Sequence, residues 1–506
     1  MAAPVEHTVK RGRFPRLCPV PLPALPWWWP MLACRRMFWY TFAMSQKTQT
    51  DLHKVSHRRR MVILGLDGLS LSMAVKLCAT GRFPHLSRLA LAPECGTVRA
   101  ELPELSPVNW TSFYTGCGPE DHGIFGFTRI SPASYQMALA DFSQVAVPTI
   151  FDRLGDAGYA SRLVNLPNTY PVRPVKGAMT VAGFVAPELS RAVHPPFLAH
   201  RLREAGYLLE ADTTRGASDL PYLLAQLRAT LQSRRYALEL LWPDLGWDVF
   251  TIVLTETDRL FHFFYDAVTE PDHPQHEACM VLLQEWDALI GRVLELYDAL
   301  PVPGRLMTLA DHGFTRLITE VDINAWLRQN GYLYTQHHDG ATAELDATGI
   351  LPETRAFALD PGRIYLHTAQ RFGRGRLTPA QAEQTMQAVT EGLLRLTYNG
   401  QPVIKAVHTA DSLYNGPLRD RAPDIVCEPH DGFDLKAKFD RTEVFGFFGR
   451  TGTHTADGAF FYDSMHAAPQ IMRHTGRLVL EHFGLAPVAQ SGRPAATGLI
   501  HPPGNK

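Results

Sequence analysis

The chain has 506 residues, 45% of them hydrophobic, and 49 Lys and Arg against 50 Asp and Glu. A chain of this length buries a large core and has room for more than one folding unit. The net charge of -1 gives no overall basic bias, so no nucleic-acid partner is expected.

The first sixty residues differ from the rest of the chain. They carry eleven Lys and Arg against two Asp and Glu, and five prolines interrupt the apolar run LCPVPLPALPWWWPMLAC. This run can neither maintain a membrane-spanning helix nor end in the cleavage site of a signal peptide. We expect residues 1–60 to be a disordered leader, or a segment upstream of a start at Met44. A surface anchor at Trp27 to Trp29 is the weaker alternative, and no membrane association is expected.

Short apolar runs from Met61 onward predict buried strands. They lie at 61–68, 159–167, 177–184, 247–257, 304–313, 422–429 and 458–462. Segments with apolar residues at three- and four-residue spacing lie between several of these runs and predict helices. Strands that alternate with helices indicate an α/β fold with a mostly parallel sheet.

We expect one domain over residues 61–485, followed by a tail at 486–506. Two Pro- and Leu-rich stretches, at about 130–245 and 320–420, are predicted to be insertions that cap the sheet edge and shape a pocket. Seven scattered cysteines without a CxxC pair favour a reducing compartment, so we expect a cytoplasmic protein. The oligomeric state stays open.

Acidic and histidine side chains follow several predicted strands. In an open α/β sheet, ligands bind beyond the carboxyl ends of the strands. The residues at such positions are Asp67, Asp258, His262, Asp311 and His312, with His454 in a late Gly- and Thr-rich loop. Each has an ordinary explanation when taken alone, such as a turn cap for Asp67 or a solvated ion pair for Asp258 and His262. Together they are the ligands that two divalent metal ions prefer.

Two such ions suit an in-line displacement at phosphorus, which needs a nucleophile near an anion-binding position. In ELSPVNWTSFYTG, Ser106 is predicted to be the N-cap of a helix and Pro107 its first residue. Helix N-termini attract phosphate. Thr111 and Ser112 fall inside the helix, where a bond back to the backbone is expected. Ser106 is therefore the candidate nucleophile, and a plain cap is the alternative.

These motifs resemble the alkaline phosphatase superfamily, and within it the type I phosphodiesterase/nucleotide pyrophosphatase branch and its phosphohydrolase/phosphomutase group. The resemblance runs from about 61 to about 483 and rests on ILGLDG, FPHLSRL, LSPVNWTSFYTGCGPEDHGIFGF, TETDRLFHFF, ADHGF, RAPDIV and GTHTADG. It implies an alkaline-phosphatase-like sheet flanked by helices.

The resemblance also implies roles for the residues that match its motifs. Asp67, Asp311 and His312 would hold one metal ion together with Ser106. The other ion would be held by Asp258, His262 and His454. Two Zn²⁺ ions are expected, with Mn²⁺ or Fe as alternatives, and Ser106 would form a covalent phospho-serine.

One departure from the family pattern concerns the substrate. Nucleotide-directed members place an asparagine shortly after the HGI turn, where this chain has Phe127. Nucleotide specificity is therefore in doubt, and Asn109 and Arg259 are the candidate substrate contacts. We expect a hydrolase of a small phosphate ester, either a monoester or a diester. A phosphomutase with the same metal site, or a non-catalytic binding protein on the same fold, are the alternatives.

Overall fold

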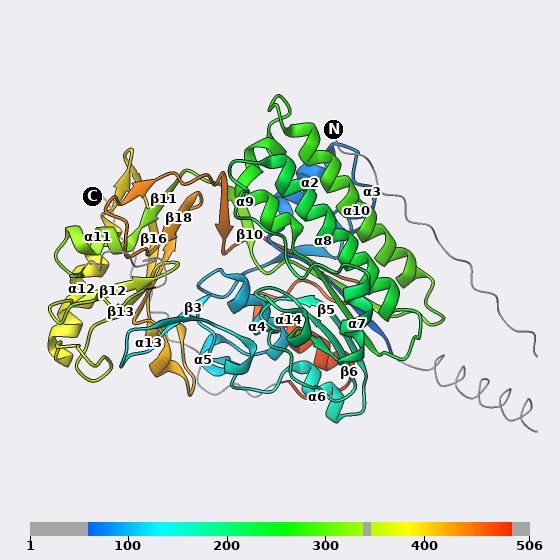
Figure 1. Ribbon diagram of the computed structural model, residues 1–506, viewed down its shortest axis with the longest axis horizontal. Helices are drawn as coiled ribbons and strands as arrows, with labels where there is room; N and C mark the ends of the chain where they lie inside the picture. Colours follow the sequence, from blue (N-terminus) through cyan, green and yellow to red (C-terminus); the bar gives the residue numbers. More distant parts are fainter. Residues whose placement is uncertain (1–58, 337–345, 488–506) are drawn as a thin grey trace, which may run out of the picture. The chain divides into compact units, whose positions relative to one another are not determined.

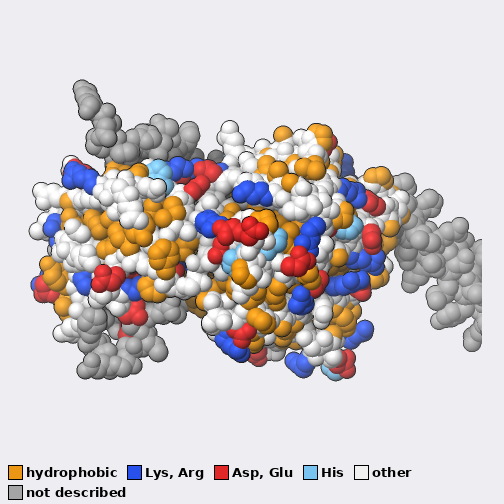
Figure 2. Space-filling view, turned by 90° about the horizontal axis from the view of Figure 1, so that it is seen from above, with side chains coloured by type: hydrophobic (Ala, Val, Ile, Leu, Met, Phe, Trp, Pro, Cys, Tyr) orange, Lys and Arg blue, Asp and Glu red, His pale blue; other side chains and the backbone are white. Residues whose placement is uncertain are grey.

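The computed structural model describes residues 59–336 and 346–487. Nearly all of the predicted leader and tail, together with Met44, Trp27 to Trp29, Cys18 and Cys34, lies outside these ranges. The five other cysteines are free thiols. Within the described ranges, no helix is long and apolar enough to cross a membrane. Figure 2 shows positively and negatively charged side chains interspersed over one face.

The fold is organised around an eight-stranded sheet in the order β2-β21-β9-β1-β8-β5-β6-β7. Its strands are β1 (Met61–Leu66), β2 (Cys95–Val98), β5 (Ser161–Leu166), β6 (Ala178–Ala182), β7 (Val193–His194), β8 (Val249–Leu254), β9 (Arg305–Leu309) and β21 (Ala459–Asp463). The five central strands β9, β1, β8, β5 and β6 run parallel, and β7, β21 and β2 join antiparallel to their neighbours. The prediction of a mostly parallel α/β sheet is confirmed.

Helices lie on both faces of this sheet (Figure 1). They are α2 (Leu71–Ala79), α3 (Pro84–Ala90), α4 (Ser106–Thr115), α5 (Pro119–His122), α6 (Ile150–Asp156), α7 (Phe197–Glu204), α8 (Leu220–Leu241), α9 (Glu256–Thr269), α10 (His276–Asp298) and α14 (Met472–His482). Helix α10 packs on α3, α8 and α9, whereas α14 packs on α4 and α6. Because both faces are covered, every residue of β1 and β8 is buried, which explains their uninterrupted apolar sequences.

A second, smaller core is formed mainly by residues 321–444, and Tyr135 joins it from an earlier part of the chain. Its sheets contain β11 (Thr319–Asp322), β12 (Ala356–Leu359), β13 (Arg363–Leu366), β16 (Ile404–Thr409), β17 (Ile425–Pro429), β18 (Phe433–Lys436) and β19 (Phe445–Gly446). Its helices are α11 (Ile323–Gln329), α12 (Pro379–Leu394) and α13 (Ala410–Leu413). The elements of this core cover the range 320–420, where an insertion is expected, and continue to Gly446 at the end of β19. The run at 422–429 forms β17, which pairs antiparallel in this second sheet and not in the central one.

Part of the range 130–245, where the other insertion is expected, forms strands of the central sheet. Strands β5, β6 and β7 lie in this range and belong to the central sheet.

The remaining short elements are the hairpin β3 (Thr128–Ile130) and β4 (Met137–Leu139), the pair β14 (Thr397–Tyr398) and β15 (Gln401–Pro402), the pair β10 (Gly313–Arg316) and β20 (Gly452–Thr455), and the 3-10 turns η1 (Phe142–Gln144), η2 (Leu189–Arg191) and η4 (Arg419–Arg421).

Glu428 on β17 anchors a cluster of basic side chains. Its carboxylate contacts His408 Nε2 at 2.9 Å, Lys405 Nζ at 2.9 Å and Arg99 Nη2 at 2.8 Å. Burial acts to raise the pKa of Glu428, but its bonds to His408 and Lys405 and the charge of Arg99 outweigh burial and lower the pKa to about 2.

The low pKa of Glu428 makes its contribution to stability depend on pH. A carboxylate with a depressed folded pKa stabilises the protein above its unfolded pKa, and the gain disappears as pH falls from about 4.5 to about 2. We expect Glu428→Gln to lower the free energy of unfolding at pH 7 by roughly 2–4 kcal/mol, and the difference to shrink over that pH range. Urea titrations of the variant and the wild type at several pH values measure this difference in the free energy of unfolding. Glu391→Gln on the exposed face of α12 is the control, and a pH-independent loss at Glu428 would contradict the assignment.

Candidate active site

Three adjacent strands of the central sheet bring most of the predicted metal ligands together at their carboxyl ends. Strands β9, β1 and β8 are neighbours and run parallel, so their carboxyl ends meet. Asp67 follows β1, Asp311 and His312 follow β9, and Asp258 and His262 lie on α9, which begins after β8. His454 arrives from β20, which pairs with β10 next to these ends.

The first group consists of Asp67, Asp311 and His312, whose ligand atoms all lie within 4.8 Å of one another. His312 Nε2 is 3.4 Å from Asp311 Oδ2 and 3.9 Å from Asp67 Oδ1. The backbone N–H of Gly68 donates to Asp311 Oδ1 at 3.2 Å, and Trp110 Nε1 donates to Asp67 Oδ2 at 3.0 Å. Each carboxylate is thus held through one oxygen and presents the other to the group.

The glycine after Asp67 is required by its backbone conformation. Gly68 has φ +69°, and a Cβ there would lie 3.1 Å from the Cα of Asp258. A residue with a side chain would therefore be strained and crowded at this turn. Gly68 lets the chain turn at once after β1 and bring its N–H to Asp311.

The second group consists of Asp258, His262 and His454. His454 Nε2 is 3.2 Å from Asp258 Oδ1 and 3.1 Å from His262 Nε2, and His262 Nε2 is 3.4 Å from Asp258 Oδ1. Asp258 and His262 are four residues apart in α9 and share one helical face, as predicted. These three atoms converge on one point, a geometry suited to a single ion.

Backbone carbonyls orient two of the imidazoles. His312 Nδ1 lies 3.0 Å from the carbonyl of Gly313, and His454 Nδ1 lies 3.0 Å from the carbonyl of Glu104. A carbonyl only accepts, so both Nδ1 atoms carry the proton and both Nε2 lone pairs face the site. The two rings stack with centroids 3.6 Å apart, which brings the two groups together.

Ser106 lies where the groups meet. Its Oγ is 3.2 Å from His312 Nε2, and the residue is 2% exposed. The predicted cap position is wrong by one residue: the N-cap is Leu105, and Ser106 is the first residue of α4. The extended backbone of Leu105 begins the helix without a side-chain cap, which leaves the Ser106 hydroxyl free to face His312.

The two other hydroxyls of this segment have structural partners, as predicted for the helix interior. Thr111 Oγ1 donates to the carbonyl of Pro107 at 2.5 Å, one turn back. Ser112 Oγ lies 3.0 Å from His122 Nε2. Both are fully buried away from the metal-ligand groups, so Ser106 is the hydroxyl that the fold presents to them.

Burial and like charges set the electrostatics of the site. Burial, with the charges of Asp311 and Asp258, raises the pKa of Asp67 well above its usual range, and burial with Asp258 raises the pKa of Asp311 to about 7. Burial also acts to raise the pKa of Asp258, but His262, His454 and Arg259 outweigh it and lower the pKa. Burial lowers the pKa of His262, His312 and His454, which keeps their lone pairs available.

The donor set fits divalent cations. Asp67 Oδ1 and Asp311 Oδ2 are buried and have no hydrogen-bond partner among residues 59–336 and 346–487. An unpaired buried carboxylate oxygen is costly unless a cation or a proton compensates it. Three carboxylates and three neutral imidazoles in two groups match the nitrogen and oxygen ligands of zinc and similar ions.

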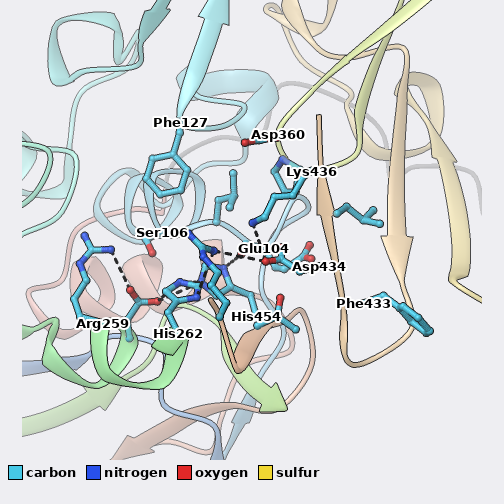
Figure 3. A pocket seen from close by; sticks show the side chains of 16 residues that line it. Glu104, Ser106, Phe127, Arg259, His262, Asp360, Phe433, Asp434, Lys436 and His454 are labelled. Carbon is cyan, nitrogen blue, oxygen red and sulfur yellow. Dashed lines mark hydrogen bonds and ion pairs between the residues drawn. The ribbon is translucent and has the colours of Figure 1, made fainter. Parts of the chain in front are cut away.

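A cavity of about 160 Å³ opens beside Ser106, and the sequence did not identify several residues that line it. Figure 3 shows Phe127 above Ser106, with Lys436 and Asp434 facing the site from β18. Lys436 Nζ is 2.7 Å from Asp434 Oδ2, and Arg450 Nη1 is 3.6 Å from the same oxygen. Side chains alternate between the two faces of a strand, so the sequence FDLK of β18 places Asp434 and Lys436 on the same face. The sequence does not show that this face lies against the cavity.

The two predicted substrate contacts have different positions. Arg259 lines the cavity and pairs with Asp258 Oδ2 at 3.2 Å and Glu210 Oε1 at 3.0 Å. Asn109 is fully buried and does not line the cavity. Its Oδ1 accepts from the N–H of Glu101 at 2.6 Å and its Nδ2 donates to the carbonyl of Leu105 at 3.1 Å. Asn109 therefore holds the segment before Ser106 and does not face the cavity.

We expect Asn109→Ala to act on stability and not on substrate binding. The change leaves the buried N–H of Glu101 without its acceptor, which costs about 1–3 kcal/mol. Thermal unfolding and KM on the same preparation test this. An increased KM with unchanged stability would instead return Asn109 to the substrate site.

The chain is similar to known proteins in sequence and in fold. Residues 61–457 match the family described as Type I phosphodiesterase / nucleotide pyrophosphatase. Phosphonoacetate hydrolase from Sinorhizobium meliloti 1021, in complex with phosphonoacetate, superposes with a TM-score of 0.57 at 15% identity, covering 84% of this chain and 96% of that chain. Murine ectonucleotide pyrophosphatase / phosphodiesterase 5 gives a TM-score of 0.50 at 13% identity, covering 86% and 98%. At such low identities, the TM-scores show a shared fold and no more. No curated protein matches the sequence.

Proposed function

The chain belongs to the type I phosphodiesterase/nucleotide pyrophosphatase family, and from this we propose that it is a metal-dependent phosphate-ester hydrolase with Ser106 as nucleophile. The observation that carries the proposal is the position of the Ser106 hydroxyl. It lies 3.2 Å from His312 Nε2, at the start of α4 and at the junction of two metal-ligand groups. The N-terminus of a helix attracts an anionic group to this same position.

The two groups divide the metal ligands in the way that the family motifs imply. Asp67, Asp311 and His312 would hold one ion, with Ser106 beside them. Asp258, His262 and His454 would hold the other. When bound, two divalent ions lower the pKa of a nucleophilic hydroxyl and offset the charge that develops on the leaving oxygen. We propose Zn²⁺ at both positions, because nitrogen and oxygen ligands in small sets suit it.

The reaction would proceed in two displacements at phosphorus. In the first, Ser106 Oγ loses its proton to solvent and forms a bond to phosphorus, while the bond from phosphorus to the ester oxygen breaks and the leaving alcohol takes up a proton. In the second, water forms a bond to phosphorus, loses a proton and releases Ser106 with its hydroxyl restored. Lys436, Arg259 and Arg450 face the cavity and would orient the anionic substrate.

The size of the cavity limits the substrate. Its volume of about 160 Å³ is below the roughly 300–1,000 Å³ of pockets that enclose larger ligands. Phe127 occupies part of its wall, at the position where nucleotide-directed relatives are expected to have an asparagine. We therefore propose a phosphate ester with a small polar arm, and not a nucleotide.

A substrate screen tests the activity and the size limit together. We expect glycerol 2-phosphate to give a higher kcat/KM than bis-p-nitrophenyl phosphate, with p-nitrophenyl phosphate between them and p-nitrophenyl sulfate inactive. Release of phosphate or p-nitrophenol is the measurement. Turnover of none of the phosphate esters by metal-loaded protein would contradict the proposal.

Labelled water separates hydrolysis from transfer of the phosphate within the substrate. With a sugar phosphate in ¹⁸O-water, a hydrolase releases inorganic phosphate that contains the label. A phosphomutase would return an isomeric sugar phosphate without label. Mass spectrometry of both products gives the answer, and we expect labelled inorganic phosphate.

A further inference from the structure

A second cavity, of about 720 Å³, lies beside the β3–β4 hairpin. Its walls come from residues 123–132, residues 140–146, strand β13, residues 371–372 and residues 420–421, and we call it the hairpin cavity. In Figure 1, β3 lies beside β13 and α13. This volume falls in the range of roughly 300–1,000 Å³ that encloses a small organic ligand. None of the proposed catalytic chemistry uses it.

The charges that line the hairpin cavity are strongly unbalanced. Four arginines, Arg129, Arg363, Arg371 and Arg421, face a single acid, Asp420. Arg129 and Arg421 are exposed at its surface and form no ion pair with a carboxylate in the described part of the chain. Arg371 is fixed by the carbonyls of Ala422 and Arg421 and is paired with Asp424, whose Oδ2 lies 3.6 Å away. A concave surface lined by arginines concentrates anions.

Arg363 is the decisive residue, because it is a fully buried cation. Its guanidinium donates to the carbonyl of Asp360 at 2.7 Å, to the carbonyl of Thr128 at 3.0 Å and to Thr128 Oγ1 at 3.1 Å. All three acceptors are uncharged, and no carboxylate of the described ranges pairs with Arg363. A buried charge without a counter-charge is costly, and a guanidinium has five donors to satisfy. An anion in the adjoining cavity would supply the missing charge.

The backbone is shaped to bring this guanidinium to the cavity wall. A Cβ on Gly126 would lie 2.4 Å from Arg363 Cζ, so only glycine admits the guanidinium at that distance. Phe127, the next residue, turns the other way and lines the cavity that contains Ser106. Likewise Asp360 and Pro361 line the Ser106 cavity. The two cavities are thus separate and share a thin wall.

Apolar and aromatic side chains form a large part of the remaining wall of the hairpin cavity, beside the polar side chains of Thr128, Ser131, Ser143 and Gln144. Phe125, Ile130, Val145, Tyr365 and Phe372 contribute to it. Arginines together with apolar side chains match a ligand that has both an anionic group and an apolar part. We propose that the hairpin cavity binds an organic anion, whose phosphonate, phosphate or carboxylate group contacts the arginines and whose hydrocarbon part lies on the apolar wall.

Isothermal titration calorimetry with phenylphosphonate tests this in the full-length, metal-loaded protein. We expect two binding events per chain, one in each cavity. Arg129→Glu combined with Arg421→Glu should weaken one event on the order of tenfold or more, because two charge-assisted contacts become repulsive. Arg201→Glu combined with Arg203→Glu on α7 is the matched control. Both of its arginines are exposed, the charge change is the same, and both events should persist.

A third variant keeps this test independent of the proposed catalytic function. His262→Ala combined with His454→Ala should remove the event in the Ser106 cavity and leave the hairpin event unchanged. A single event in the wild type that is lost in the histidine variant and kept in the Arg129 and Arg421 variant overturns the hairpin proposal. Equal weakening of the same binding event in the Arg201 and Arg203 control also overturns the hairpin proposal. Loss of turnover in any variant does not bear on the result.

Discussion

Replacing Ser106 with alanine is expected to lower kcat by about 10³-fold or more and to leave the fold intact. The large effect follows from the loss of the atom that would form the bond to phosphorus. The small effect on stability follows from the contacts of the side chain: the hydroxyl does not cap α4, and its hydrogen-bond neighbours, His312 Nε2 and the Asp311 carboxylate, both belong to the site. Initial rates at saturating substrate and thermal unfolding of the same sample measure both quantities.

Ser112→Ala is the matched control, because it removes a second buried hydroxyl from the same helix. It leaves the ring of His122 without its partner at Nε2, which should cost about 1–3 kcal/mol of stability. Its kcat should stay near that of the wild type. The two variants therefore have opposite signatures, one in rate and one in stability. If Ser112→Ala lost turnover and Ser106→Ala kept it, the nucleophile would be wrongly assigned.

The parts of the fold that follow from local pattern were predictable from the sequence. A strand buried on both faces has an uninterrupted apolar sequence, so MVILGL identified β1 and the position of Asp67 after it. The acids and histidines at 258, 262, 311 and 312 follow in the same way from β8 and β9. What the sequence did not contain was the order of strands, which is set by pairing between distant segments.

Strands β5 and β6 show this limit. Their apolar runs were recognised as strands, yet they lie in a Pro- and Leu-rich range that was predicted to be an insertion. Only their pairing, β5 beside β8 and β6 beside β5, places them in the central sheet. The run that became β17 shows the converse: it has the apolar sequence of a buried strand, and it is buried in a different, antiparallel sheet.

The candidate site was predictable as a set of ligands and not as a pocket. Side chains that hold metal ions follow strands and belong to motifs. Lys436 and Asp434 instead reach the cavity from a part of the chain with its own core, and Arg450 reaches it from the segment before β20. Ser106 was identified for a reason that proved inexact. Its helix has Leu105 as N-cap and begins at Ser106 itself, so the Ser106 hydroxyl is directed to His312 by the turn into α4 and not by capping. Asn109, one turn later, stabilises that turn.

Removal of divalent metal is expected to abolish activity and to lower the unfolding temperature by several degrees. Asp67, Asp258 and Asp311 are all nearly inaccessible to solvent, and without cations their carboxylates lie among like charges. A cation that binds only the native state stabilises it by about 4 kcal/mol at a concentration 1,000 times its Kd. Dialysis against a chelator, followed by thermal unfolding and an activity assay, gives both results, and added Zn²⁺ should restore them.

The number of metal ions bound per chain tests each of the two metal-ligand groups separately. We expect two ions per chain in the wild type, measured by inductively coupled plasma mass spectrometry. Asp67→Asn combined with His312→Ala should remove one ion, and His262→Ala combined with His454→Ala should remove the other, because no ligand is shared between the two groups. Asp463→Asn is the control, since that buried carboxylate pairs with Arg305 at the opposite end of β9. If chelation changed neither activity nor unfolding temperature, the orphaned oxygens of Asp67 and Asp311 would need another partner, and the two-metal reaction would be excluded.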